Sequence, residues 1–168
     1  MRPMSVAQHR AARISVPCVV MTVSDTRTQE TDTGGRAIVD SLTAEGHEVI
    51  ARELVPDDPD RIAAVLRLSL NGRAQAVILT GGTGVAPRDT TVDTVAPMFE
   101  RRLDGFGELF RMLSYDQVGA AAMLSRACAG VIAGRIVFVL PGSEAAVRLA
   151  MDRLILPELS HLVRELSR

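Results

Sequence analysis

Residues 80–89 hold the residue types of an anion-binding loop beside a carboxylate. Three glycines fall within Thr80–Gly84, directly after the apolar run Ala76–Leu79, so the turn begins where a buried strand should end. Successive backbone N–H groups in such a turn can point into one concavity and hold an anion. Arg88 adds a planar cation, and Asp89 adds a carboxylate that can bind a divalent metal. The stretch indicates a site for a phosphorylated ligand and a metal.

Two well-known phosphate loops do not fit this stretch. A P-loop requires Gly-Lys-Ser/Thr after its glycines, whereas Val85 follows Gly84 here. The dinucleotide fingerprint requires a third glycine where this chain has Pro87. A glycine turn that only packs a helix on a sheet is the remaining alternative. Packing alone does not require the neighbouring threonines, arginine and aspartate, so we favour the ligand-binding interpretation.

Polar residues also follow the other predicted strands. Ser24 and Asp25 come after the first strand, and Asp57 comes after the second. A turn at 141–143 follows the last strand and opens a helix, whose free N–H groups can hold an anion. The carboxyl ends of parallel strands meet at one edge of a sheet, so we expect these groups to lie near the glycine loop. Because Asp57 is followed by Asp-Pro, a purely capping role for it stays open.

Apolar runs and helical patterns alternate in the first half of the chain. Strands over Pro17–Val23, His47–Leu54 and Ala76–Thr80 are separated by helices from about Gly35 to Glu45 and from Pro59 to Asn71. This order is the signature of parallel βαβ units. For the second half we predict a short helix over Thr91–Phe99, a helix over Leu103–Leu113, strands over Ala127–Ile132 and Arg135–Leu140, and a helix from Glu144 towards Leu166 with a kink or restart at Pro157.

Length and composition predict one domain over 17–168, preceded by a flexible tail over 1–16. The net charge of −1 gives no overall basic field and aromatic residues are few, so we expect no nucleic-acid partner. No apolar run reaches the length of a membrane span and no signal-peptide pattern occurs, which favours a cytoplasmic protein without a membrane partner. Cys18 and Cys128 lie in apolar runs, so buried reduced thiols are favoured over a disulfide or a metal site.

Several other polar side chains have an ordinary structural role as their default interpretation. Arg111 is expected to form a surface ion pair with Glu108. His47 is expected at a solvated strand start, and His161 on the polar face of the last helix. No histidine is matched with a suitable serine or cysteine, so a nucleophilic triad is not supported.

Together these residues resemble the MoaB/Mog family of molybdenum cofactor biosynthesis proteins, from about Val16 to the C-terminus. The stretch Phe106–Ser114 is closer to the MoaB branch than to the Mog branch. The resemblance implies a three-layer α/β/α fold with a mainly parallel central sheet, assembled into trimers or hexamers. The motifs that carry it are Val23–Arg27, Asp32–Gly35, Thr80–Gly84 with Pro87–Asp89, Gly105–Glu108 and Leu140–Ser143.

The resemblance also implies a reaction. Members bind molybdopterin, a pterin dithiolene with a terminal phosphate, and active members transfer an adenylyl group to it. The phosphate attacks the α-phosphate of Mg-ATP, which gives adenylylated molybdopterin and pyrophosphate. Other molybdenum cofactor biosynthesis proteins are further partners that the resemblance implies. Two alternatives are a carrier that binds molybdopterin without catalysis, and a nucleotide pyrophosphatase of the CinA type.

The family's two essential acids, which hold Mg²⁺, fall on Asp57 and Asp89. One departure from the common pattern is visible, because this chain reads Thr91-Val92-Asp93 where members often carry Thr-Pro-Glu. It retains the Arg-Asp pair of the glycine loop, which favours an active enzyme. The residues that the resemblance assigns to nucleotide or molybdopterin binding are Ser24, Asp25, Arg27, Thr80, Gly81, Gly82, Thr83, Gly84, Arg88, Glu108, Arg111, Pro141, Gly142 and Ser143.

Overall fold

A computed structural model describes residues 14–168 and contains one six-stranded sheet in the order β2-β1-β3-β6-β5-β4. The first four strands in this order run parallel, whereas β5 pairs antiparallel with both β6 and β4. The sheet is therefore mainly parallel with an antiparallel edge, as expected. The strands are β1 (Pro17–Val23), β2 (Glu48–Val55), β3 (Ala76–Thr80), β4 (Arg101–Arg102), β5 (Cys128–Ile132) and β6 (Arg135–Leu140).

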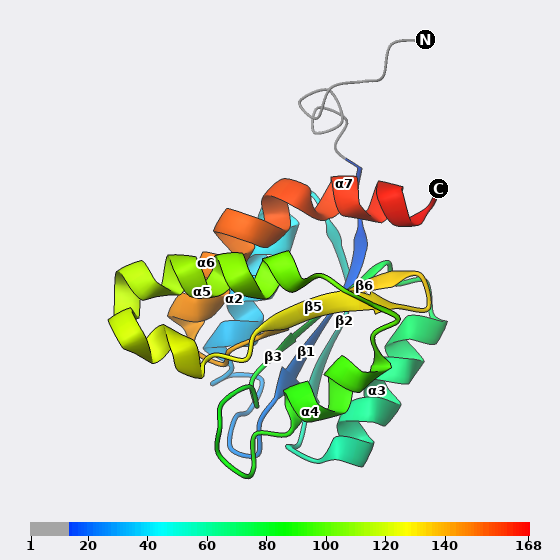
Figure 1. Ribbon diagram of the computed structural model, residues 1–168. Helices are drawn as coiled ribbons and strands as arrows, with labels where there is room; N and C mark the ends of the chain where they lie inside the picture. Colours follow the sequence, from blue (N-terminus) through cyan, green and yellow to red (C-terminus); the bar gives the residue numbers. More distant parts are fainter. Residues whose placement is uncertain (1–13) are drawn as a thin grey trace.

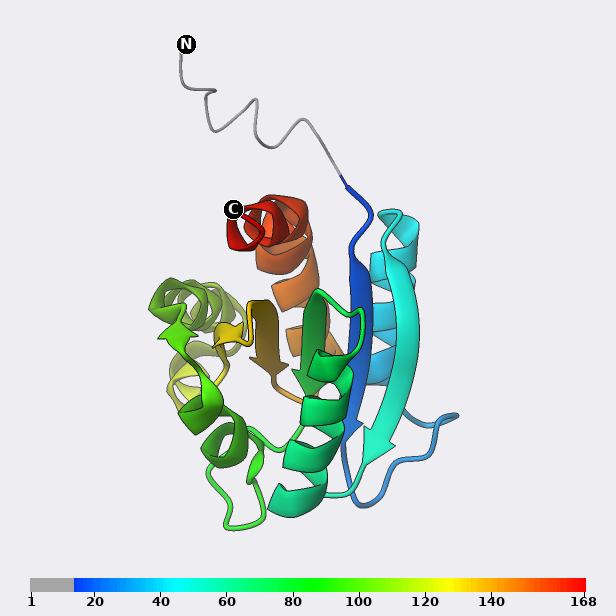
Figure 2. The ribbon, with the colours of Figure 1, turned by 90° about the vertical axis from the view of Figure 1, so that its right-hand side faces the viewer.

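Helices cover both faces of the sheet, as Figures 1 and 2 show. Apolar residues of α2, α5, α6 and α7 form one core cluster, and those of α3 and α4 form a second cluster on the other face. The predicted three-layer α/β/α class is confirmed. The helices are α2 (Thr33–Ala44), α3 (Pro59–Asn71), α4 (Thr91–Val95), α5 (Asp104–Val118), α6 (Glu144–Ala150) and α7 (Leu156–Leu166).

Strand β1 is covered on both faces of the sheet, which explains its uninterrupted apolar sequence. Cys18 and Val20 belong to the core cluster on the α2 side, and Val19 and Met21 belong to the cluster on the α3 side. Successive side chains of a strand point to opposite faces, so a strand covered on both sides needs apolar residues at every position. The sheet therefore separates the two core clusters and contributes side chains to both.

The first two helices begin at aspartates. Asp32 accepts a hydrogen bond from the Gly35 N–H, and Asp58 accepts one from the Arg61 N–H with proline at the next position. Each carboxylate satisfies an N–H that the first helical turn leaves free. Helix α2 therefore begins at Thr33, two residues earlier than predicted.

The second half differs from expectation in three places. The helix predicted over Leu103–Leu113 extends to Val118 and continues as a 3₁₀ segment over Gly119–Leu124. The two-residue strand β4 was too short to show any sequence period. The predicted kink at Pro157 is a π-helical stretch over Met151–Ile155. Proline cannot donate to the carbonyl four residues earlier, and the widened turn absorbs this break.

Residues 1–13 of the predicted tail lie outside the described residues. Val16, which we expected in the tail, is fully buried, and its N–H donates to Nδ1 of His47 at 3.2 Å. The predicted solvated position of His47 is wrong, because only 9% of this residue is exposed. His161 is half-buried on α7 and contacts Glu158 and Glu165. The folded part therefore includes residues before Pro17.

Cys18 and Cys128 are buried free thiols, which confirms that prediction. Burial raises the pKa of Cys18 to about 12. Among the described residues, no helix combines the length and the apolar character needed to cross a membrane.

Candidate active site

A cavity of about 210 Å³ opens at the carboxyl edge of the parallel strands. It lies where β1, β2, β3 and β6 end, which is where open parallel sheets bind ligands. The predicted site residues that line it are Ser24, Asp25, Arg27, Asp57, Thr80, Gly81, Gly82, Arg88, Asp89 and Gly142. Four loops, distant in sequence, therefore contribute to one polar cavity.

Six predicted site residues do not line this cavity. Thr83 is buried within the glycine loop, and the Gly84 carbonyl accepts from Arg126. The Pro141 carbonyl accepts from the Thr80 hydroxyl at 2.8 Å. These three residues shape the loops around the cavity.

The other three lie farther along the fold. Ser143 caps α6 by accepting from the Ala146 N–H, and it lines a neighbouring cavity between α5 and α6. Glu108 is exposed on α5. Arg111 donates to the carbonyl of Ala127 at 3.1 Å, and the expected ion pair with Glu108 is not formed.

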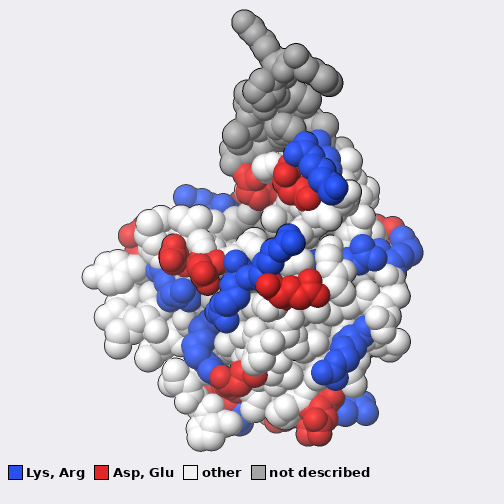
Figure 3. Space-filling view, turned by 45° about the vertical axis from the view of Figure 1, so that its right-hand side comes forward, with Lys and Arg blue, Asp and Glu red and all other residues white. Residues whose placement is uncertain are grey.

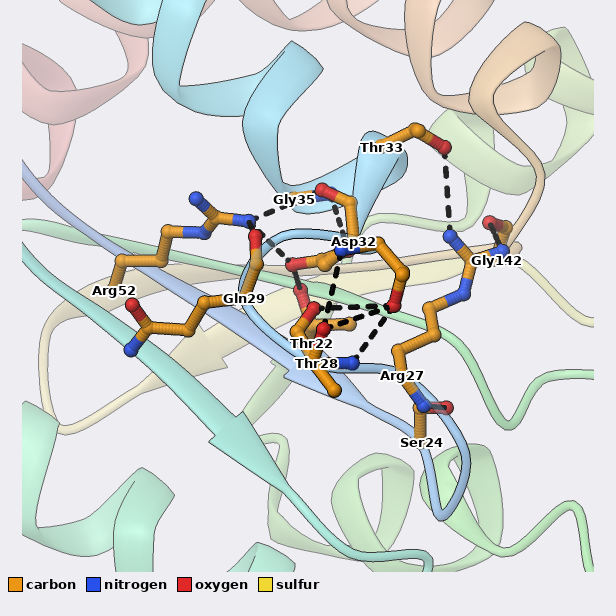
Figure 4. A network of polar contacts seen from close by, with 11 residues as sticks. Thr22, Ser24, Arg27, Thr28, Gln29, Asp32, Thr33, Gly35, Arg52 and Gly142 are labelled. Carbon is orange, nitrogen blue, oxygen red and sulfur yellow. Dashed lines mark hydrogen bonds and ion pairs between the residues drawn. The ribbon is translucent and has the colours of Figure 1, made fainter.

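The loop after β1 is shaped by Ser24 (Figure 4). Its hydroxyl accepts hydrogen bonds from the N–H groups of Thr26 and Arg27, at 3.2 and 3.1 Å. A serine that bonds to the backbone two and three residues later holds the chain in a tight turn. The Arg27 side chain then reaches across to the Gly142 carbonyl at 3.4 Å. This turn holds a cation over the gap between β1 and the loop after β6.

Asp32 is the centre of a buried network beside the site (Figure 4). One carboxylate oxygen accepts from the Thr22 hydroxyl at 2.7 Å and from Arg52 at 3.0 Å, and the other accepts from the Gly35 N–H. Burial alone would raise the pKa of Asp32, but the hydrogen bonds from Gly35, Thr22 and Arg52 outweigh it and lower the pKa. The network ties β1, β2 and α2 together behind the cavity.

Asp57 is half-buried, and its Oδ1 is fully buried. Burial raises its pKa, and the charges of Asp25 and Asp89 raise it further, against opposing effects of the Thr90 N–H and Arg88. The charges of Asp25 and Asp89 thus disfavour ionisation of the Asp57 carboxyl, and a cation at this position would offset their effect. The site therefore has a local demand for positive charge.

Three buried oxygen atoms beside this site lack a hydrogen-bond partner among the described residues: Asp57 Oδ1, Thr90 Oγ1 and Thr91 Oγ1. A Cβ atom on Gly82 would lie 2.2 Å from the Thr91 hydroxyl and 2.9 Å from Asp57 Oδ1, so glycine at this position gives these atoms room. Buried polar atoms are almost always satisfied in folded proteins. Unsatisfied oxygens at a polar cavity suit a ligand or a hard cation.

Gly81 is required by the backbone at the end of β3. Its φ is +101°, and a Cβ would lie 2.2 Å from the Val23 carbonyl oxygen. The Gly81 N–H donates to the Leu140 carbonyl at 3.0 Å. The backbone of the glycine loop is thus wedged between β1 and β6, and this N–H is occupied within the protein.

Arg126 holds the opposite side of the glycine loop, and sequence reasoning missed it. It donates to the Gly84 carbonyl at 3.0 Å and to the Asp89 carbonyl at 2.9 Å. It also pairs with both carboxylate oxygens of Asp93, one of the two residues at which this chain departs from the common motif. No local pattern marks Arg126, because its partners lie more than thirty residues earlier.

The chain is similar over nearly its whole length to known proteins. A family model described as "Probable molybdopterin binding domain" matches residues 19–161. Molybdenum cofactor biosynthesis protein B of Bacillus subtilis is 49% identical over 168 residues, covering 98% of this chain and 99% of that protein.

Solved structures extend the comparison to the fold. A crystal structure of Molybdenum cofactor biosynthesis protein B matches with a TM-score of 0.91 at 45% identity, covering 94% of this chain and 99% of that one. The tungsten cofactor synthesizing protein MoaB from Pyrococcus furiosus matches with a TM-score of 0.85 at 34% identity, covering 94% and 100%. These matches span nearly the whole chain and include the strand ends that form the cavity. The chain therefore belongs to the MoaB/Mog family of molybdenum cofactor biosynthesis proteins.

Proposed function

We propose that this protein binds molybdopterin and transfers the adenylyl group of Mg-ATP to its terminal phosphate. A phosphate oxygen of molybdopterin forms a bond to the α-phosphorus of ATP. The bond from that phosphorus to the bridging oxygen of the β-phosphate breaks, and pyrophosphate leaves with the electron pair. The products are adenylylated molybdopterin and pyrophosphate.

One observation carries the proposal: the unpartnered Asp57 Oδ1 lies beside a polar cavity that also holds Asp25, Asp89 and two arginines. Transfer at a phosphorus centre needs positioning and charge neutralisation rather than a protein nucleophile. Acids for a metal and cations for phosphate oxygens, gathered at one sheet edge, meet that need.

The residues of this cavity fit a magnesium ion. Asp57 and Asp89 would hold it, and the unpartnered oxygens beside Gly82 match its preference for oxygen ligands. No group of three or more His, Cys, Asp or Glu residues within 14–168 forms a ready-made metal cage. Magnesium keeps several waters and shares substrate phosphates, so two carboxylates suffice. When bound, the ion supplies neutralisation of the phosphate charge.

The protein's own groups divide the remaining work. The N–H groups of Gly82, Thr83 and Gly84 have no hydrogen-bond partner among the described residues, whereas that of Gly81 is occupied by Leu140. Of these residues only Gly82 lines the cavity, so its N–H is the one that the proposal gives to a phosphate oxygen. Arg88 is exposed at the cavity and bonds to no described residue, so it can stabilise charge on the transferring group.

The test is direct. Purified protein is incubated with molybdopterin and Mg-ATP, and adenylylated molybdopterin and pyrophosphate are measured. We expect Asp89→Asn to lower the rate by about 100-fold or more, with molybdopterin binding retained. Asp60→Asn, which changes an exposed carboxylate outside the cavity, serves as the matched control and should leave the rate unchanged.

The same assay separates the alternatives. Tight molybdopterin binding without any ATP-dependent product would show that the protein is a carrier and not an enzyme. Hydrolysis of a dinucleotide without pterin would favour a pyrophosphatase. Equal loss of pterin binding and turnover in Asp89→Asn would assign Asp89 to pterin contact or folding. Assembly into trimers or hexamers stays a prediction that sedimentation analysis measures.

A further inference from the structure

The chain contains no lysine, so every basic side chain in Figure 3 is an arginine, and acidic side chains lie beside several of them on the face shown. A guanidinium carries its N–H donors on three nitrogen atoms in one rigid plane. It can therefore hold several acceptors at fixed angles, which the single nitrogen of lysine cannot do. Arg126 uses all three of its nitrogen atoms in this way.

Each nitrogen atom of the Arg126 guanidinium bonds to a different residue. Nε donates to the Gly84 carbonyl at 3.0 Å, and Nη2 donates to the Asp89 carbonyl at 2.9 Å. Nη1 donates to both carboxylate oxygens of Asp93, at 2.8 and 3.0 Å. Asp93 lies on helix α4, so one side chain joins both ends of the stretch 84–89 to that helix.

The stretch 84–89 contains a turn that is closed on itself. The Asp89 N–H donates to the Ala86 carbonyl at 2.9 Å, and proline follows Ala86, where such a turn favours it. The Ala86 N–H donates in return to Oδ2 of Asp89 at 3.0 Å. Both bonds lie within the stretch. Among the described residues outside it, only Arg126 bonds to its backbone, so Arg126 holds the turn against the rest of the fold.

The turn sets the direction of the Asp89 carboxylate. Oδ2 is occupied by the Ala86 N–H, whereas no described residue donates to Oδ1, so Oδ1 is available to a ligand of the sheet-edge cavity. A Cβ on Gly84 would lie 2.6 Å from Oδ2, so glycine at this position gives the carboxylate room. The two residues that shape this arrangement, Gly84 and Asp89, are the two whose carbonyls Arg126 holds. A displacement of either end of the turn would move the carboxylate.

We propose that Arg126 is a positioning residue that holds the turn so that Asp89 can bind the magnesium ion of the sheet-edge cavity. The inference rests on the proposed function, in which Asp57 and Asp89 hold that ion. Asp93 orients the guanidinium, because its carboxylate occupies Nη1 and leaves the other two nitrogens for the carbonyls. Arg126 does not line the sheet-edge cavity, so its effect on the ion passes through Asp89.

Limited digestion with trypsin tests the hold on the turn without any ligand. The exposed Arg88 lies in the turn, and mass spectrometry measures cleavage after it. Arg126→Lys keeps the charge and the number of trypsin sites but loses the planar fork, so we expect this cleavage to be about tenfold faster. Asp93→Asn should accelerate it by a smaller factor. Arg73→Lys is the matched control, because Arg73 also bonds to a carboxylate, that of Glu48, at the opposite edge of the sheet. It should leave cleavage after Arg88 unchanged.

Binding of Mn²⁺ in the presence of ATP, measured by electron paramagnetic resonance, tests the effect on the metal site. Molybdopterin is left out, so the measurement does not require adenylyl transfer. We expect Arg126→Lys to weaken Mn²⁺ binding by about tenfold, and Asp89→Asn to weaken it at least as much. The double variant should bind Mn²⁺ as Asp89→Asn does, because a residue that acts through Asp89 adds nothing once that carboxylate is lost.

Unchanged cleavage after Arg88 in Arg126→Lys would overturn the proposal. Effects on Mn²⁺ affinity that add in the double variant would also overturn it, because Arg126 would then act on the ligand by another route. Circular dichroism melts verify that each variant is folded. Absence of Mn²⁺ binding by the unmodified protein would remove the metal site and this role of Arg126 with it. The expected cleavage and Mn²⁺ results without any adenylylated molybdopterin would reject the proposed function alone.

Discussion

The carboxylate of Asp25 accepts a hydrogen bond from the backbone N–H of Asp57 at 2.9 Å. This bond links the loop after β1 to the loop after β2 and orients the backbone at the more buried acid. The same contact brings a negative charge beside the Asp57 carboxyl and contributes to its raised pKa. The Asp25 side chain therefore positions the backbone of Asp57 and adds to the effect of burial on the pKa of the Asp57 carboxyl.

Replacing Asp25 separates these two effects. Asp25→Asn keeps an oxygen acceptor but removes the charge, so we expect the pKa of Asp57 to fall while the loop keeps its geometry. Asp25→Ala removes the acceptor as well and should lower adenylyl transfer further than Asp25→Asn does. A ¹³C carboxyl NMR titration measures the pKa. A pKa for Asp57 that rises in Asp25→Asn contradicts the electrostatic argument.

Asp57 is expected to cost stability at neutral pH. Its pKa in the folded protein is raised above the unfolded value of 3.8. The loss in free energy of unfolding is therefore absent below pH 3.8 and fully present above the raised pKa. Asp57→Asn should therefore raise the melting temperature at pH 7 and leave it nearly unchanged near pH 3. The control is Asp40→Asn on the exposed face of α2, which should shift stability by less than about 0.5 kcal/mol at either pH.

Asp32 has the opposite dependence. Its pKa is lowered on folding, so its stabilisation is present above the unfolded value of 3.8 and is lost as the pH falls through the folded pKa. Asp32→Ala removes a helix cap and leaves the Arg52 charge without its carboxylate, which should cost about 3 kcal/mol at pH 7. Urea unfolding measures this. Asp32→Asn keeps a cap acceptor and should lose less.

Gly81→Ala tests the close approach of the glycine loop to β1. Both the positive φ and the 2.2 Å distance from a Cβ to the Val23 carbonyl oppose a side chain, so we expect a loss of more than about 2 kcal/mol. Gly46 is a matched control, because its φ is +81° and no atom lies within 4 Å of a Cβ. Gly46→Ala should cost only about 1 kcal/mol, from backbone strain alone. Similar losses in both variants would remove the steric argument.

Local pattern was sufficient for most of the fold. The strand Ala76–Thr80 and the helix Pro59–Asn71 have the predicted bounds, because an apolar run buried on both faces and an aspartate followed by proline are local signals. Strand β4 is absent from the prediction, since its two arginines pair with β5 through backbone bonds that leave no side-chain period. The burial of His47 was not predicted for a similar reason, because His47 accepts a hydrogen bond from the backbone N–H of Val16, which lies far away in the sequence.

The site divides in the same way. Rules for parallel sheets bring the strand ends to one edge, so residues such as Asp25 and Asp57 were predicted together. Glu108 and Arg111, which the family resemblance assigned to ligand binding, lie on helix α5 and do not line the sheet-edge cavity. Arg111 lines a different cavity, beside β4 and β5. The roles of Arg126 and Asp32 as supports of the loops depend on distant partners and had no local signal.

By itself, the sequence determined the order of the helices and of every strand except β4, the glycine turn and the acids that follow the strands. These properties follow from hydrophobic period, helix capping and the conformational freedom of glycine, which act over a few residues. Only the tertiary structure decided which N–H of the glycine loop is occupied, which oxygens of Asp57 and Thr91 stay unpartnered, and where Arg111 and Arg126 point. These depend on contacts between segments far apart in the chain, which only the packed fold brings together.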